Sequence, residues 1–201
     1  MSEKNNCIIT IGRQYGSGGR IIGEKVAKEL NIDFYDKDLI KMIADKTGIT
    51  EELIRKIEQL KATHSIFDAY DHTCHIPMTE KIYQAQDKLV KGIAEKGSCV
   101  IVGRCADYIL RDNPNCLKVF IHAPIAERVK RVEDEYKPKI VDIEKFVKQL
   151  DKDRATYYSY FTSLKWGEKS HYDIVINSSM GIDTCVEVLK AAFNGTCCKN
   201  K

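Results

Sequence analysis

Glycines and arginines gather in one short stretch near the start of the chain, Gly12-Arg13-Gln14-Tyr15-Gly16-Ser17-Gly18-Gly19-Arg20. Apolar residues typical of a strand precede it, and a pattern typical of a helix follows it. Such a turn places several backbone N–H groups and the positive end of the helix around one point, which suits a phosphate. The alternative is a tight connection that binds nothing. We expect phosphate binding by these residues: Arg13, Gly16, Ser17, Gly18, Gly19 and Arg20.

This turn departs from the usual phosphate-binding loop at two positions. When GSGGR is laid on GxGK[ST], Gly19 stands at the lysine and Arg20 at the Ser/Thr that coordinates Mg²⁺. Arg20 or Arg13 could supply the missing positive charge, because a guanidinium spans two phosphate oxygens. Neither side chain can bind a metal, and Ser17 is an alternative hydroxyl inside the turn. Arg20 is therefore also a candidate catalytic residue, while the sequence identifies no metal ligands.

Alternating strand and helix patterns must position the glycine turn. Five strands are expected, at residues 7–11, 32–35, 99–102, 117–121 and 173–176. Apolar residues at helical spacing cover 19–30, 37–46, 51–60, 79–96, 123–135, 143–160 and 182–193. Strands this apolar, separated by helices, indicate a parallel sheet covered on both faces. We expect one α/β domain over residues 1–201, with three layers around a five-stranded parallel sheet.

Two inserted segments interrupt this pattern. The first spans residues 48–78, and its polar part contains His72, Cys74 and His75. These side chains could suggest a metal, but their spacing matches no standard zinc pattern, and a mobile loop that folds over a substrate is favoured. The second insert, residues 133–141, is highly charged, and we expect a lid over about residues 128–150.

The composition is that of an ordinary globular protein. Of 201 residues, 30% are charged and 43% hydrophobic, which excludes disordered, collagen-like and membrane-spanning classes. The net charge of +3 is too small for a protein that coats nucleic acid, so neither a nucleic-acid nor a membrane partner is expected. The eight cysteines form no CxxC pair, and the N-terminus resembles no secretion signal. Reduced thiols and a cytoplasmic location are therefore expected.

Longer segments resemble the cytidylate kinase-like family, which is related to the nucleoside monophosphate kinases. The similarity begins with the run IITIGRQYGSGGRIIGEKVAKELNIDFYDKDLI and continues through CVIVGRCADYIL, LKVFIHAPIAERVKRV, LDKDRATYYSYF and HYDIVINSS. Members of this family share the glycine in place of the loop lysine. The resemblance implies a P-loop kinase fold in which residues 48–78 bind the acceptor. It also implies ATP and Mg²⁺ as cofactors and a small phosphorylated acceptor such as (d)CMP.

Arg104 follows the strand expected at 99–102. Ligands of open α/β sheets bind at the carboxyl ends of strands, although a surface arginine at a helix start is the alternative. The position resembles the Gly-Arg-Asp of cytidylate kinases, whose arginine binds the monophosphate. Cys105 replaces that aspartate, Asp107 is a candidate substitute, and Val102 stands where those kinases carry an acid. These departures weaken the expectation of cytidine specificity and of a metal site.

Arg128 and Arg131 lie three residues apart on one face of an expected helix. In the kinases that the chain resembles, arginines at this place reach from the lid to the transferring phosphoryl group. Positive charge is the main catalytic device in that reaction. The resemblance makes both arginines candidate catalytic residues, and a solvated helix face is the alternative.

Asp151 and Arg154 form an Asp-x-x-Arg unit. It resembles the acceptor-binding pair that follows the lid in cytidylate kinases, although the same spacing occurs in ordinary helical ion pairs. The neighbouring Asp153 leaves the assignment open. The aromatic residues beyond this unit are expected mainly to pack in the core: Tyr157, Tyr158, Tyr160, Phe161 and Trp166.

Three other polar residues also follow strands. Asp36 could cap the next helix, or, because the resemblance places substrate nearby, could orient an acceptor hydroxyl or a hydrated metal. Asn177 and Ser178 follow the last strand, where related kinases place the loop around adenine.

The expected function is that of an ATP-dependent phosphotransferase of the nucleoside monophosphate kinase type. A monophosphate acceptor is already ionised and needs no general base. One alternative is a kinase of another small acceptor, favoured if Cys105 abolishes cytidine recognition. The other is a nucleotide-binding regulatory protein without catalysis, favoured by the missing lysine, Ser/Thr and strand-end acid.

Overall fold

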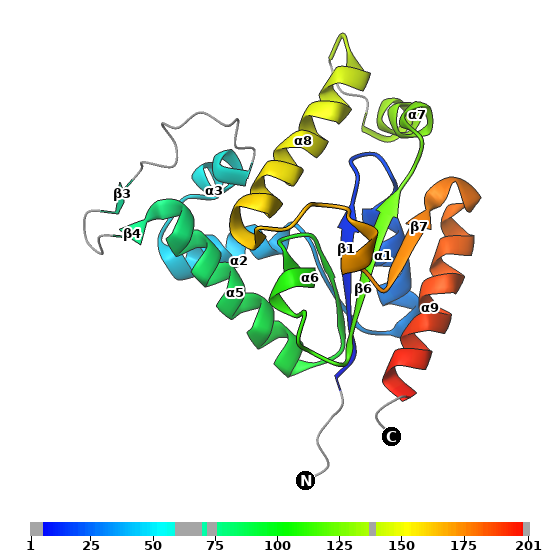
Figure 1. The fold of residues 1–201 in the computed structure, drawn as a ribbon, viewed down its shortest axis with the longest axis horizontal. Helices are drawn as coiled ribbons and strands as arrows, with labels where there is room; N and C mark the ends of the chain where they lie inside the picture. Colours follow the sequence, from blue (N-terminus) through cyan, green and yellow to red (C-terminus); the bar gives the residue numbers. More distant parts are fainter. Residues whose placement is uncertain (1–5, 59–69, 72–75, 137–139, 199–201) are drawn as a thin grey trace.

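The computed structural model describes residues 6–58, 70–71, 76–136 and 140–198. A parallel sheet of five strands forms its centre, in the order β2-β5-β1-β6-β7 (Figure 1). The strands are β2 (Asp33–Tyr35), β5 (Cys99–Val102), β1 (Ile8–Arg13), β6 (Cys116–His122) and β7 (Ile174–Asn177). The expected three-layer α/β class with a five-stranded parallel sheet is confirmed.

The central strand divides its side chains between two cores because successive residues of a strand point to opposite faces. Ile9 and Ile11 pack on one face with residues of α1 (Gly19–Leu30) and α9 (Ile182–Cys198). Ile8 packs on the other face. β1 is therefore buried from both sides, and the loop that follows it leaves the middle of the sheet.

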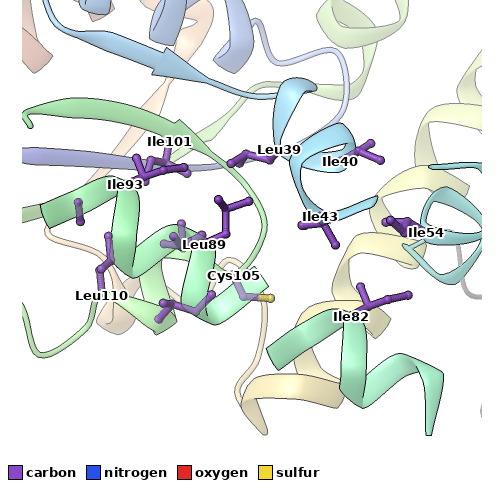
Figure 2. Close-up of a cluster of buried hydrophobic side chains, with 14 of the residues drawn as sticks. Leu39, Ile40, Ile43, Ile54, Ile82, Leu89, Ile93, Ile101, Cys105 and Leu110 are labelled. Atoms are coloured by element: carbon purple, nitrogen blue, oxygen red, sulfur yellow. The ribbon is translucent and has the colours of Figure 1, made fainter. Parts of the chain in front are cut away.

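The second core joins a helix of the first insert, and the helices on either side of that insert, to the sheet. Here α2 (Asp38–Thr47), α3 (Glu51–Glu58) and α5 (Met78–Lys96) pack over β5. Figure 2 shows Ile43, Ile54 and Ile82 among this cluster, one from each helix, and none of the three is exposed to solvent. Each such burial contributes about 1.5–3 kcal/mol, so these three helices are held firmly against the sheet.

Two long helices lie beside the loop after β1 (Figure 1). They are α7 (Ile125–Tyr136) and α8 (Ile143–Thr162), and they pack against each other. Residues 137–139 between them lie outside the described part, as do His72, Cys74 and His75 of the first insert. Most of the lid that the sequence predicts over about residues 128–150 therefore lies within these two helices.

Several short elements were not predicted. The helix α6 (Ala106–Ile109) follows β5 directly, and the strands β3 (Tyr70–Asp71) and β4 (Ile76–Pro77) pair antiparallel. Two 3₁₀ helices, η1 (Lys169–His171) and η2 (Ser178–Met180), flank β7. α6 is hard to predict because Arg104 and Cys105 before it have positive φ angles, 61° and 51°. Neither residue type favours such angles, so the sequence gives no sign of the turn.

Of the two roles open to Asp36 in the sequence, the helix cap is not formed. α2 begins at Asp38 after an N-cap at Lys37 that makes no side-chain capping bond. The Asp36 carboxylate instead accepts hydrogen bonds from two arginines. In this structure Asp36 therefore belongs to the ligand end of the sheet.

Five cysteines of the described part divide into two kinds. Cys99, Cys105, Cys116 and Cys185 are free and buried. Burial raises the pKa of the Cys99 thiol to about 12, so that it stays protonated. Cys7 is disulfide-bonded, which corrects the expectation of reduced thiols at that position. Within the described residues, no helix has the length and apolar character to cross a membrane.

Candidate functional site

A cavity of about 660 Å³ lies at the carboxyl ends of β1, β2 and β5. This is the edge at which open α/β sheets bind ligands. The glycine loop after β1 forms one wall, and residues of α3, α6 and α8 form others. Six cationic residues line it: Arg13, Arg20, Lys37, Arg55, Arg104 and Arg154. The acidic residues of the lining are Asp36, Asp107 and Asp153, so positive charge dominates the cavity.

Positive φ angles shape the glycine loop. Gly16 has a φ of 75° and Gly18 a φ of 78°, both in the left-handed region that favours glycine. α1 begins immediately afterwards at Gly19, and the amides of a first helical turn have no acceptors within the helix. The loop can therefore offer backbone N–H groups and the positive end of α1 to an anion.

One carboxylate holds both arginines that could replace the loop lysine. Asp36 Oδ1 accepts from Arg13 Nη2 at 3.3 Å, and Asp36 Oδ2 accepts from Arg20 Nε at 2.9 Å. The Asp36 side chain is 11% exposed, whereas that of Arg20 is 42% exposed. Asp36 thus orients two guanidinium groups at the cavity wall beside the glycine loop.

A strained turn presents Arg104. Gly103, Arg104 and Cys105 all have positive φ angles, and a Cβ at Gly103 would collide with the Arg13 guanidinium. The Gln86 side chain of α5 supports the turn, because its Nε2 donates to the Arg104 carbonyl at 2.7 Å and its Oε1 accepts from the Tyr157 hydroxyl. Strain of this kind persists only where surrounding contacts enforce it, often at ligand sites.

Arg104 and Arg154 place positive charge in a poorly hydrated environment. Burial lowers the pKa of Arg104 to about 10 and that of Arg154 to about 9, and repulsion from Arg13 acts in the same direction on both. Arg154 also donates to the Arg13 carbonyl at 3.0 Å, which places it against the base of the loop. An anion bound near these groups would relieve the cost of burying their charge.

Asp107 lies in the cavity wall, where its carboxylate already accepts a hydrogen bond from another side chain. The residue is 7% exposed, and its Oδ2 accepts from the Tyr158 hydroxyl at 2.8 Å. Burial raises the pKa of this carboxyl. The neighbouring acid Asp153 accepts from Gln149 at 2.7 Å, so both carboxyls are bound by side chains of α8.

The other sequence candidates, all in the described part of the chain, do not line the cavity: Ser17, Arg128, Arg131, Asp151, Asn177 and Ser178. Arg128 is 6% exposed and donates to the carbonyls of Ala123 and Tyr15, each at 3.1 Å. Arg131 donates to the Gly16 carbonyl at 2.6 Å. Both arginines of the lid segment therefore contact the backbone of the loop.

The segment after β7 is tied to the same loop. The Ser178 hydroxyl donates to the Ser17 carbonyl at 2.6 Å, and both residues are buried. Asn177 caps η2, since its side-chain oxygen accepts from the Ser179 amide at 3.1 Å. These contacts hold the segment that was expected to surround adenine against the glycine loop.

Comparison with known proteins places this loop and cavity in a family. The chain matches the cytidylate kinase-like family over residues 8–180. The protein belongs to this family. A cytidylate kinase of Thermococcus kodakarensis is 26% identical over 196 residues, which are 95% of this chain and 90% of that protein. The predicted family is thereby confirmed.

Solved structures show the same fold. The crystal structure of an uncharacterized protein from Eubacterium ventriosum has a TM-score of 0.71 at 29% identity, and the match covers 94% of this chain and 98% of that chain. A shikimate kinase from Acinetobacter baumannii, in complex with shikimate, has a TM-score of 0.52 at 17% identity, with 96% of each chain covered. The P-loop kinase fold predicted for this cytidylate kinase-like protein is confirmed.

Some cavity residues of this cytidylate kinase-like protein were not predicted. Arg55 lies on α3, where it forms an exposed ion pair with Glu51 at 3.1 Å, yet it also lines the cavity. Lys37 and Gln149 join it there. The spacing of Arg55 from Glu51 is that of an ordinary helical ion pair, so its sequence carries no signal of a site. Only the packing of α3 over the sheet reveals it.

Metal-binding groups are sparse in this member of the family. The described residues hold no group of three or more His, Cys, Asp or Glu side chains that could bind an ion. Mg²⁺ in phosphate-transferring sites is often held by one or two carboxylates together with phosphates and water. Both oxygens of Asp36, a carboxylate of the lining, accept from the loop arginines, and each oxygen keeps a second lone pair with which Asp36 can act as one such ligand.

Proposed function

We propose that the protein is an ATP-dependent phosphotransferase that acts on a nucleoside monophosphate or a similar small phosphorylated acceptor. The observation that carries this proposal is a single cavity joining the glycine loop to a second cluster of arginines. Membership of the cytidylate kinase-like family supports it. The loop is the donor end of the cavity, and Arg55, Arg104 and Arg154 form the acceptor end.

At the donor end, the loop amides and the start of α1 bind the phosphates of ATP. Arg13 and Arg20 supply the charge that lysine provides in other loops, because both lie in the lining beside Gly19. When bound, Mg²⁺ neutralises charge on the transferring phosphates. Asp36 is the residue on this chain that would hold it, acting with water and the phosphates.

At the acceptor end, three arginines bind the monophosphate. Arg104 and Arg154 carry destabilised positive charge, and Arg55 reaches the cavity from α3. Phosphoryl transfer needs positioning and electrostatic stabilisation more than covalent chemistry from the protein. These side chains would orient the acceptor and stabilise the transition state, and Asp107 would line the remainder of its binding site.

A kinase of a hydroxyl-bearing acceptor is the second candidate. Asp36 in the cavity lining favours it, because a carboxylate there can orient or accept the proton of an attacking hydroxyl. Cys105 favours it too, since its buried thiol stands where cytidylate kinases have an aspartate. Both candidates share the donor end and differ only in the acceptor.

The test is an acceptor screen with a matched pair of arginine variants. The protein is incubated with ATP, Mg²⁺ and either nucleoside monophosphates or hydroxyl-bearing small acids and sugars, and ADP formation is measured. Arg104→Ala should raise the acceptor KM about tenfold to a hundredfold, the value of a charged hydrogen bond. Arg111→Ala is the control, because Arg111 stacks on Tyr108 at 4.2 Å and lies outside the cavity lining.

The outcomes separate the candidates. Stimulation by a monophosphate, with the Arg104 effect and no Arg111 effect, supports the proposed function. Turnover only with hydroxyl acceptors supports the second candidate. ATP binding without any turnover refutes both and leaves a nucleotide-binding regulatory protein.

A further inference from the structure

Every carbonyl of the loop from Arg13 to Ser17 accepts a hydrogen bond. The donor to the Gln14 carbonyl is the Ser17 amide at 3.3 Å, within the loop. The other four donors are side chains from elsewhere in the chain: Arg154 to Arg13, Arg128 to Tyr15, Arg131 to Gly16 and Ser178 to Ser17. A loop that binds phosphate through its amides must turn its carbonyls away from the ligand. Here three guanidinium groups and one hydroxyl donate hydrogen bonds to four of those carbonyls.

The backbone of Tyr15 is held on both sides by one ion pair. Its amide donates to Asp151 Oδ1 at 2.7 Å, and its carbonyl accepts from Arg128 Nη1 at 3.1 Å. Arg128 Nη1 and Asp151 Oδ2 are themselves 2.5 Å apart, which closes the ring of contacts. The side chains of both partners are largely buried, at 8% and 15% exposure, so solvent screens the pair weakly.

The backbone of α7 also approaches the loop closely. A Cβ on Gly16 would lie 2.7 Å from the Arg128 carbonyl oxygen and 3.0 Å from Val132 Cγ2. Arg131 donates to the Gly16 carbonyl at 2.6 Å from the next turn of the same helix. Glycine at position 16 therefore serves the docking of α7 as well as the positive φ of the loop.

We propose that Arg128, Arg131 and Asp151 form a clasp that fixes the peptide groups of Tyr15 and Gly16 so that the loop is preorganised for phosphate. In this assignment they are positioning residues: Arg128 and Arg131 do not contact the transferring phosphoryl group, and Asp151 does not bind the acceptor. The proposal rests on the proposed function only in taking ATP as the phosphate ligand. A glycine-rich loop loses much conformational entropy when it becomes ordered. Because the clasp orders the loop before the ligand binds, that entropy is not lost during binding.

The clasp also couples the lid segment to nucleotide affinity. Arg128 and Arg131 lie on α7, and Asp151 lies on α8, so a movement of either helix would change the contacts of Tyr15 and Gly16. We therefore expect the effects of clasp variants on nucleotide binding to appear before any acceptor is added.

The first experiment needs no ligand. Amide hydrogen exchange at Tyr15 is measured by NMR in the full chain, in the wild type and in Asp151→Ala. Asp151→Ala removes the carboxylate that accepts the Tyr15 hydrogen bond. Exchange of the Tyr15 amide should therefore become at least about tenfold faster, since local opening governs protection. Asp173→Ala is the matched control, because Asp173 Oδ2 accepts the Lys118 amide at 2.8 Å at another place in the sheet. Equal Tyr15 exchange in all three proteins would overturn the clasp.

The second experiment measures MgATP affinity by calorimetry in the absence of acceptor. Asp151→Ala should weaken MgATP binding about tenfold while the acceptor KM stays within about twofold. If Asp151 binds the acceptor, the acceptor KM rises and MgATP affinity is unchanged, which would overturn the proposal. Asp151→Asn, which keeps an oxygen for the Tyr15 amide, serves if the alanine variant does not fold, and should give a smaller loss in the same direction.

Arg131 distinguishes positioning from direct catalysis. Arg131→Lys keeps one donor for the Gly16 carbonyl, so it should restore most of the MgATP affinity that Arg131→Met loses, with kcat within about threefold of the wild type. A lysine variant with normal MgATP affinity and a kcat lowered about a hundredfold would instead mark a catalytic arginine. If the wild type does not bind MgATP, the proposed function fails, whereas the exchange result at Tyr15 still decides the clasp.

Discussion

Gly16→Ala tests the close packing of the glycine loop against α7. The added Cβ would meet a backbone oxygen, Arg128 O, at 2.7 Å and the side chain of Val132 at 3.0 Å. A backbone oxygen in a helix cannot swing aside as the end of a flexible side chain can. Either α7 or the loop must therefore shift when the methyl group is introduced.

The expected magnitude has two parts. Gly16 has a φ of 75°, and a residue with a Cβ in the left-handed region costs about 1–2 kcal/mol. Forcing an extra carbon into a packed contact costs about 1–3 kcal/mol more. Gly48→Ala isolates the first part, because Gly48 has a φ of 71° and nothing within 4 Å of its added Cβ.

The assay is thermal and denaturant unfolding of both variants and the wild type, together with calorimetric titration of pyrophosphate. Gly48→Ala should lose about 1–2 kcal/mol and Gly16→Ala about 2–5 kcal/mol, with each kcal/mol lowering Tm by about 2–4 °C for a chain of this length. Only Gly16→Ala should also weaken pyrophosphate binding. If the two variants are equally stable and pyrophosphate affinity is unchanged, α7 is not docked on the loop and the reasoning fails.

Three further predictions concern charge and protonation. Because burial raises the pKa of Asp107 above its ordinary 3.8, its contribution to stability is full at low pH and is lost as pH rises through the folded-state pKa. The free energy of unfolding of Asp107→Asn should therefore increase relative to the wild type as the pH rises above about 4, and a constant difference would contradict this. Asp36→Asn removes the counter-charge of Arg13 and Arg20, so metal-free inorganic phosphate should bind about two- to fivefold more tightly by calorimetry, and weaker binding would count against the assignment. The four buried free cysteines should resist iodoacetamide in the native protein and react on unfolding, as followed by mass spectrometry; rapid native labelling would show that they are accessible.

The layered fold could be predicted because its signals are local. Residues 99–102 are four consecutive apolar residues, and the structure places a strand over the same four. The strand, glycine turn and helix from Ile8 to Leu30 could likewise be predicted in their order along the chain. Boundaries moved where tertiary pairing extends a strand, as at β6, which pairs with β1 from Cys116 and with β7 as far as His122.

The roles of individual polar residues were less predictable. Asp36 has the residue type of a helix cap, and Arg55 has the spacing of a surface ion pair, yet both line the cavity. Arg128 and Arg131 have the charge expected of groups that reach a phosphoryl group, yet they donate to loop carbonyls. In each case residue type and spacing are the same for the two roles, and the partner lies far away in the sequence.

The amino-acid sequence by itself determined the apolar periodicity, and so the parallel sheet, and it determined the glycines that allow a phosphate loop at the end of the first strand. Hydrophobic patterning and positive φ preferences act over a few residues, so both can be recognised without knowing the fold. Only the tertiary structure decided which arginines face the cavity and which support the loop from behind. That choice depends on how α3, α7 and α8 pack around β1, because a guanidinium is directed by partners 16 to 141 residues away.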